Sequence, residues 1–142
     1  MSRQYIPASL RRTIAEQAGQ RCGYCQTAQA YSGGQLHMDH IIPLAAGGQT
    51  IESNLWLACG LCNRYKGTKT HALDPVIDEI VPLFNPRLQI WWEHFAWSED
   101  GSDIIGQTPS GRATVIALKL NNDYIVPARR NWVRAGWHPP RQ

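Results

Sequence analysis

The chain has 142 residues, of which 43% are hydrophobic and 18% are charged. This length predicts a single domain over residues 1–142, and the composition excludes a disordered chain, because disorder combines low hydrophobicity with high charge. The formal net charge of +3 is too small to establish a polyanionic partner. No apolar run reaches the roughly 18 residues of a membrane span, and the first residues lack the apolar stretch of a secretory signal. We therefore expect a cytoplasmic protein with no membrane partner.

The charges are unevenly distributed along the chain. Residues 104–142 contain six Lys and Arg against one Asp, a net charge of +5. Residues 76–103 contain one Arg against six Asp and Glu, a net charge of −5. The basic tail is either scattered surface charge or a face that binds phosphates, and composition alone does not separate the two.

A short amphipathic helix is predicted over residues 7–18. Leu10 and Ile14 share one face of it, Ser9 is a candidate N-cap, and Gly19 is a candidate stop. We expect this helix to pack against the rest of the domain.

A strand, a second strand and a helix are predicted next. Residues 36–43 are typical of a strand that ends at a proline, and residues 53–58 are typical of a second short strand. The polar, basic residues 63–69 favour a short helix. The local order is therefore strand, strand, helix.

The second half of the chain predicts a supporting extension. Proline-rich residues 74–86 indicate an irregular traverse with a strand or two, and an Asp-Gly turn at residues 100–101 indicates a hairpin. Five tryptophans in this half either stack on unpaired bases or pack in the core, and packing is the reading we favour. The predicted elements are a hairpin within residues 90–106 and helices over residues 112–120 and 123–135.

Four cysteines form two Cys-x-x-Cys pairs. They are Cys22 with Cys25 and Cys59 with Cys62. Two such pairs make a closed tetrahedral site for a structural Zn²⁺. Two disulfides would need an oxidising compartment, and a redox site would need only one pair, so zinc is the favoured interpretation.

Three polar residues between and beside these cysteines suit phosphodiester cleavage. The neutral imidazole of His40 can take a proton from water. Asp39 and Asn63 offer one carboxylate and one amide oxygen, which suffice for a hard cation such as Mg²⁺ that keeps most of its waters. Because neighbours on an ideal strand point to opposite sides, Asp39 and His40 serve one site only if the strand bends or ends there.

This pattern resembles the zinc-bearing form of the HNH endonuclease family. The resemblance covers about residues 21–70, and its specificity lies in several features that agree in order and spacing. It implies an α+β fold with a ββα-metal core at residues 21–70, a zinc site made by the four cysteines, an N-terminal helix and a C-terminal extension at residues 71–142. The motifs that carry it are Asp39-His40-Ile41-Ile42-Pro43-Leu44, Gly47-Gly48, Asn54-Leu55, and Cys59-Gly60-Leu61-Cys62-Asn63 with Lys66.

The resemblance implies a role for each matching residue. His40 matches the general base, and Asp39 matches the metal-binding acid before it. Asn54 matches the middle asparagine, which braces the loop that holds the base. Asn63 stands where many members have a final histidine, which makes this chain an HNN variant. An amide at that position favours Mg²⁺ or Mn²⁺ as the catalytic cation over softer ions.

Basic residues follow the second cysteine pair. Arg64, Lys66 and Lys69 are expected to neutralise phosphates beside the cleavage site, and the alternative is a solvated helix face. Lys66 is the strongest of the three because the family pattern has a lysine there. His37 is a further candidate ligand or phosphate contact, although a solvated histidine is the favoured reading. DNA is the expected partner, and RNA is not excluded.

The leading prediction is therefore a metal-dependent endonuclease, a hydrolase that cleaves DNA phosphodiester bonds with a histidine base. One alternative is a zinc-dependent nucleic-acid-binding module without catalysis. Such a module binds DNA but does not cleave it, whichever divalent ion is supplied. Another is an interaction protein that uses the tryptophan-rich hairpin and does not retain DNA at low salt.

Overall fold

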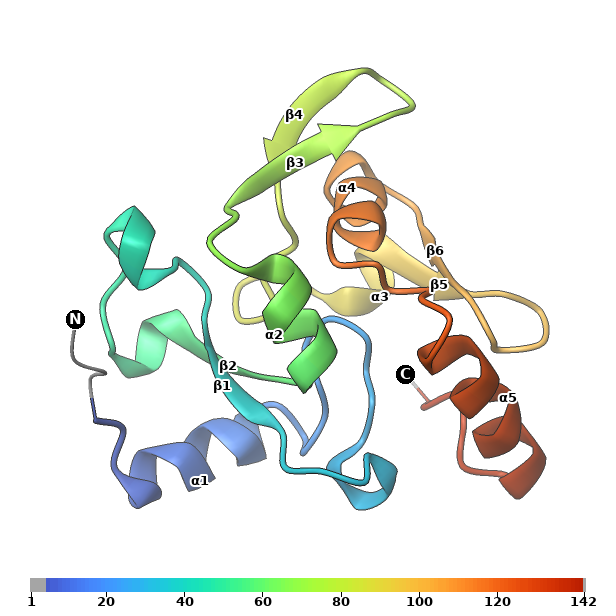
Figure 1. The fold of residues 1–142 in the computed structure, drawn as a ribbon, viewed down its shortest axis with the longest axis horizontal. Helices are drawn as coiled ribbons and strands as arrows, with labels where there is room; N and C mark the ends of the chain where they lie inside the picture. Colours follow the sequence, from blue (N-terminus) through green and yellow to red (C-terminus); the bar gives the residue numbers. More distant parts are fainter. Residues whose placement is uncertain (1–4, 142) are drawn as a thin grey trace. The chain divides into compact units, whose positions relative to one another are not determined.

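The structure is a computed structural model that describes residues 5–141, and the chain divides into two compact units (Figure 1). The first unit runs up to Thr70 and also includes Asn85–Leu88. The second unit comprises His71–Phe84 and the chain from Gln89 onward. The main division between the two units falls after Thr70.

The first unit contains the predicted order of strand, strand and helix. It is an α+β arrangement in which a two-stranded antiparallel sheet lies between two helices in the chain. Its elements are α1 (Ala8–Gln17), β1 (His37–His40), β2 (Leu55–Ala58) and α2 (Gly60–Lys66), with 3-10 turns at Gln29–Tyr31, Leu44–Ala46 and Glu52–Asn54.

Helix α1 packs against the sheet through its apolar face. Ile14 is fully buried beside Leu55 of β2 and Ile6, and Leu10 and Met38 complete this small core. The predicted cap at Ser9 is wrong, because the N-cap position is occupied by Pro7 and no side chain caps the helix.

Strand β1 is shorter than the predicted strand over residues 36–43. It pairs with β2 from His37 opposite Ala58 to His40 opposite Leu55. One further bond runs from the Ile41 amide to the Asn54 carbonyl at 2.9 Å. The residues just before β2 form the 3-10 helix Glu52–Asn54 and are not extended. The regular pairing of β1 with β2 therefore stops after His40.

Helix α2 begins at Gly60, three residues before the predicted start at residue 63. The amide of Cys62 donates to the sulfur of Cys59 at 3.4 Å and so caps the first turn. The second cysteine pair is therefore the first turn of the helix. Gly67, with φ +54, follows its last residue.

The second unit differs from the prediction in three places. The expected traverse with a strand or two over residues 74–86 contains part of a hairpin, the first residues of the hairpin predicted over 90–106 form a helical turn, and the helix over residues 112–120 starts earlier. The observed elements are β3 (His71–Asp74), β4 (Glu79–Pro82), α3 (Trp91–His94), β5 (Phe95–Trp97), β6 (Ile104–Gly106), α4 (Pro109–Ala117) and α5 (Ile125–Ala135).

Aromatic packing fills the core of the second unit. The ring centroid of Trp91 lies 5.0 Å from that of Phe95 and 5.2 Å from that of Trp97. Phe84 contacts Phe95 edge to face at 5.1 Å. Core packing is therefore confirmed for Trp91, which is buried.

The basic tail includes an arginine that does not face solvent. Arg129 on α5 is fully buried and donates to the carbonyls of Ser102 and Leu120 at 3.0 and 2.6 Å. Its charge serves internal contacts, so it is not available to a phosphate. Within residues 5–141, every helix lacks the length or the hydrophobicity that a membrane crossing requires.

Candidate functional site

The four cysteines converge on one point. Their sulfur atoms all lie within 4.8 Å of one another, and those of Cys25 and Cys59 are 3.6 Å apart. None of the four forms a disulfide. Four thiolates at this separation suit a tetrahedral zinc ion with bonds of about 2.3 Å and leave no open position for substrate. Cys22, Cys25, Cys59 and Cys62 thus form a cluster that fits a structural metal.

The cysteine cluster joins parts of the first unit that are distant in sequence. Cys22 and Cys25 follow α1, whereas Cys59 and Cys62 stand at the start of α2. The amide of Cys25 approaches the sulfur of Cys22 at 3.5 Å, as the amide of Cys62 approaches Cys59. The cluster therefore anchors the start of α2 beside the loop after α1.

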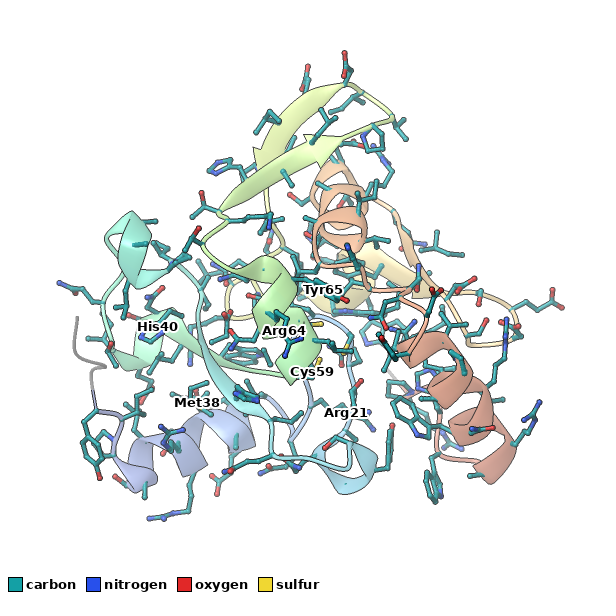
Figure 2. The ribbon with its side chains drawn as sticks, viewed as in Figure 1. Arg21, Met38, His40, Cys59, Arg64 and Tyr65 are labelled. Carbon is teal, nitrogen blue, oxygen red and sulfur yellow. The ribbon has the colours of Figure 1, made fainter. Side chains whose placement is uncertain are left out.

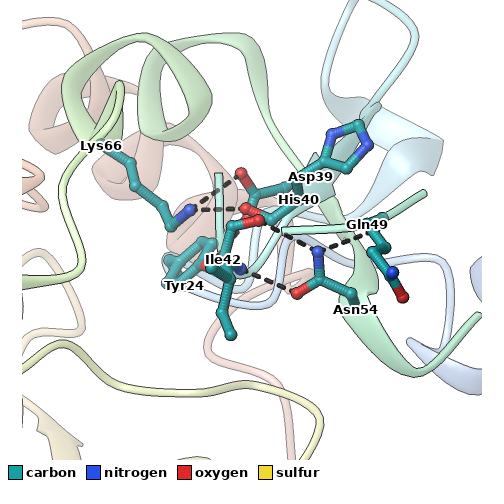
Figure 3. Close-up of polar contacts among 7 residues, drawn as sticks. All are labelled: Tyr24, Asp39, His40, Ile42, Gln49, Asn54 and Lys66. Carbon is teal, nitrogen blue, oxygen red and sulfur yellow. Dashed lines mark hydrogen bonds and ion pairs between the residues drawn. The ribbon is translucent and has the colours of Figure 1, made fainter. Parts of the chain in front are cut away.

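Asp39 and His40 end β1 with their side chains on different sides. The carboxylate of Asp39 turns toward α2, whereas the imidazole of His40 points away from Lys66 (Figure 3). Asp39 is only 3% exposed, and His40 is half-buried. The two side chains therefore point to different sides of the strand, as expected for neighbours on an ideal strand.

Both oxygens of Asp39 have protein partners. Oδ2 accepts from the Tyr24 hydroxyl at 2.7 Å, and Oδ1 lies 3.3 Å from the Lys66 ammonium. Burial raises the pKa of Asp39 above its usual value, and the positive charge of Lys66 opposes that rise. Burial also raises the pKa of Tyr24 well above its usual value, so its hydroxyl remains the donor.

Lys66 does not make the surface contact that we predicted. Its side chain is 2% exposed, and its Nζ donates to the His40 carbonyl at 2.8 Å as well as to Asp39 (Figure 3). The expected phosphate contact is replaced by an internal ion pair, because Lys66 is on the side of α2 that faces β1. Arg64 and Lys69 are exposed, and Arg64 projects from α2 in Figure 2.

A threonine holds the imidazole of His40. The Nε2 atom lies 2.9 Å from the Thr50 hydroxyl oxygen. If that oxygen accepts the Nε2 proton, Nδ1 retains its lone pair. Burial lowers the pKa of His40, and the Asp39 charge opposes the decrease. The neutral form of the ring, which can accept a proton, is therefore favoured near neutral pH.

Asn54 makes the bracing contacts expected of it. Its amide oxygen accepts from the Ile42 amide at 2.8 Å, and its amide nitrogen donates to the carbonyls of Ile42 and Gln49 at 3.0 and 2.8 Å (Figure 3). Gly48 lies against the Ile42 carbonyl, with which a Cβ atom at this position would collide. Asn54 thus fixes the loop that carries Thr50.

The three predicted catalytic side chains border one cleft of about 780 Å³ in the first unit. Asp39 and His40 border it from β1, Asn63 from α2 and Pro43 from the turn after β1. His37 borders the same cleft and is exposed. The end of β1 and helix α2 therefore bring His40 and Asn63 to the same cleft, although they are more than twenty positions apart in the sequence.

The donor set of this cleft suits a hard cation. A carboxylate and an amide oxygen are ligands that Mg²⁺ accepts when it keeps several waters. Each carboxylate oxygen of Asp39 accepts more than one bond, so the contacts to Tyr24 and Lys66 leave lone pairs for a metal. Asp39 and Asn63 are thus the residues that could hold such an ion.

The chain was compared with known proteins. The family model of the HNH endonuclease matches residues 22–69. Residues 22–69 are therefore similar to the HNH endonuclease domain. The match contains both cysteine pairs, β1, β2 and α2, and it ends inside the first unit. The match of this HNH segment suggests a nuclease-type function related to nucleic acids. The chain matches neither a curated protein nor a solved structure.

Two residues of the HNH site were not identified from the sequence. Tyr24 lies inside the first cysteine pair, and its bond to Asp39 spans 15 positions. Thr50 follows the two glycines of the loop and resembles an ordinary turn residue. No spacing rule connects either residue with its partner, because each contact depends on how the loop folds back.

Proposed function

We propose that this protein is a metal-dependent endonuclease that hydrolyses DNA phosphodiester bonds. The observation that carries the proposal is that Asp39, His40 and Asn63 border one cleft within the segment that matches the HNH family. The four-cysteine cluster supports a structural Zn²⁺ beside that cleft.

In the proposed reaction His40 is the general base. Its Nδ1 takes a proton from the attacking water while the Thr50 hydroxyl holds Nε2, and Asn54 keeps the Thr50 loop in place. Asp39 and Asn63 would hold a Mg²⁺ or Mn²⁺ ion, which when bound would stabilise negative charge on the scissile phosphate and the leaving oxygen. Lys66 and Tyr24 fix the orientation of Asp39.

The exposed cations beside the cleft support nucleic acid as the substrate. Arg64 and Lys69 lie on and after α2, close in sequence to Asn63. Contacts to phosphates give affinity without base preference. We therefore propose weak sequence preference for the HNH cleft itself.

Nicking of a supercoiled plasmid in Mg²⁺ tests the proposal. The native protein should nick the plasmid, and His40→Ala should reduce the rate by at least about a hundredfold, the usual contribution of a general base. His71→Ala, a change at an exposed histidine of the second unit, should retain the native rate. Equal nicking by the native protein and His40→Ala would remove His40 from the mechanism.

One observation favours a second candidate, a DNA-binding module without catalysis. Asp39 is nearly inaccessible, and both its oxygens are engaged by the protein. Zinc-loaded protein that binds DNA but does not cleave it with Mg²⁺, Mn²⁺ or any other divalent ion would favour that candidate.

A further inference from the structure

A second depression continues the HNH cleft. It has a volume of about 310 Å³ and, like the cleft, belongs to the first unit. Both hollows are bordered by Arg11 of α1, by Gln35 and Leu36, and by Met38 of β1, which is labelled in Figure 2. Because they share these residues, the two hollows lie next to each other between β1 and α1, and together we call them the groove.

The groove is lined in part by cations. Arg11 borders both hollows, and Arg12 borders the second one. Both side chains are exposed, and among residues 5–141 neither has an ion-pair partner. The Nε of Arg11 donates to the Ile6 carbonyl at 3.3 Å, a bond that does not use the terminal nitrogens of its guanidinium.

The rest of the lining mixes polar with apolar side chains, the apolar ones being Ala15, Leu36, Met38 and Leu57. Three glutamines, Gln20, Gln29 and Gln35, border the second hollow, and Glu16 is the one acidic residue there. A site for an apolar ligand would instead be lined mostly by hydrophobic side chains. Arginines with neutral amides are the side chains that contact a phosphate backbone.

The charge of the whole first unit agrees with an anionic ligand. This unit carries eight Lys and Arg against three Asp and Glu, a net charge of +5. The second unit carries six against eight, a net charge of −2, despite its basic tail. A polyanion is therefore attracted to the unit that contains the groove.

We infer that the DNA backbone leaves the HNH cleft across α1, where Arg11 and Arg12 bind its phosphates. The inference rests on the proposed function for its substrate but adds a contact surface outside the HNH segment. The contacts are independent of base sequence, and Glu16 weakens them. They add to the exposed cations Arg64 and Lys69, which lie on and after α2.

The test measures binding of a fluorescein-labelled DNA duplex without divalent ions, in a His40→Ala background, at several salt concentrations. Arg11→Gln and Arg12→Gln should each weaken binding about three- to tenfold at low salt. Each should lower the slope of log affinity against log salt by about 1, the value for one lost phosphate contact. Glu16→Gln should strengthen binding, a gain that misfolding would not produce.

Lys119→Gln is the matched control, because Lys119 is an exposed cation of the second unit. It should leave affinity and salt slope unchanged. Native affinity and slope in both arginine variants, or an equal loss in Lys119→Gln, would overturn the inference. Binding needs no cleavage, so the arginine effects would persist even if the plasmid assay showed no nuclease activity. The binding assay therefore tests the inference about Arg11 and Arg12, and the plasmid assay separately tests the proposed nuclease activity.

Discussion

At the scale of single residues, the site is organised by a buried ion pair. Lys66 and Asp39 are 2% and 3% exposed, so each charge depends on the other for the interactions that water would supply. Lys66 also holds the His40 carbonyl. The lysine that we expected to face DNA instead connects α2 to the residues at the end of β1.

Replacement of Lys66 by methionine should destabilise the protein in a pH-dependent way. The change leaves the Asp39 carboxylate buried without its cation, at a cost of about 3 kcal/mol. Burial already raises the folded-state pKa of Asp39, and loss of the positive charge raises it further. The penalty is therefore largest above that pKa and shrinks as the pH falls and Asp39 becomes protonated.

Urea denaturation at pH 5 and pH 8, without added divalent ions, measures this effect as the difference between variant and native protein. Lys69→Met is the control, because Lys69 is exposed and its Nζ donates to the Tyr65 carbonyl at 3.0 Å rather than to a buried carboxylate. An equal loss of stability at the two pH values would contradict the role given to Asp39.

At the scale of elements, the loop between β1 and β2 determines how the base is held. Asn54 bonds to Ile42 and Gln49, and the residue after Gln49 is the Thr50 that contacts His40. The loop therefore transmits the position of Asn54 to the imidazole through two hydrogen-bonded steps. Gly48 is needed where the loop crosses the Ile42 carbonyl.

Thr50→Val should slow plasmid nicking about five- to tenfold, close to the worth of one hydrogen bond of about 1 kcal/mol. The valine keeps the branched shape but cannot accept the Nε2 proton, so the ring loses its fixed orientation. Thr50→Ser should restore most of the rate because it keeps the hydroxyl. DNA affinity should be the same in all three proteins. Equal rates for the valine and serine variants would exclude Thr50 as a positioning residue.

The elements differ in how well the sequence predicts them. The order of β1, β2 and α2 follows from local patterns, whereas the end of β1 depends on where its partner strand begins. For the hairpin of β3 and β4, the proline-rich sequence predicted only an irregular traverse with a strand or two. Pro75 follows β3 and Pro82 is the last residue of β4, so neither interrupts the pairing.

The start of α4 shows a local pattern that was overlooked. Thr108 caps the helix by accepting from the Gly111 amide, and Pro109 occupies the first helical turn. Both are common at helix starts. The predicted start at residue 112 followed the apolar residues instead of these capping residues.

At the scale of the whole molecule, charge and chemistry lie in the same unit. The first unit contains the cysteine cluster, the cleft and a net charge of +5. The basic tail suggested a phosphate face in the second half, but acidic residues outnumber basic ones in the second unit, and Arg129 is buried. The candidate site was predictable because its residues form a family pattern, whereas its supporting contacts depend on tertiary structure.

The proposed mechanism needs Asp39 and Asn63 to form a cation site in the HNH cleft, separate from the cysteine cluster. Titration of zinc-loaded protein with Mn²⁺, followed by electron paramagnetic resonance, tests it most directly. We predict one exchangeable Mn²⁺ per chain in the native protein and in the surface control Asn131→Ala. Asn63→Ala should weaken this binding at least about tenfold while the zinc content stays at one per chain. Native Mn²⁺ affinity in Asn63→Ala would contradict the account.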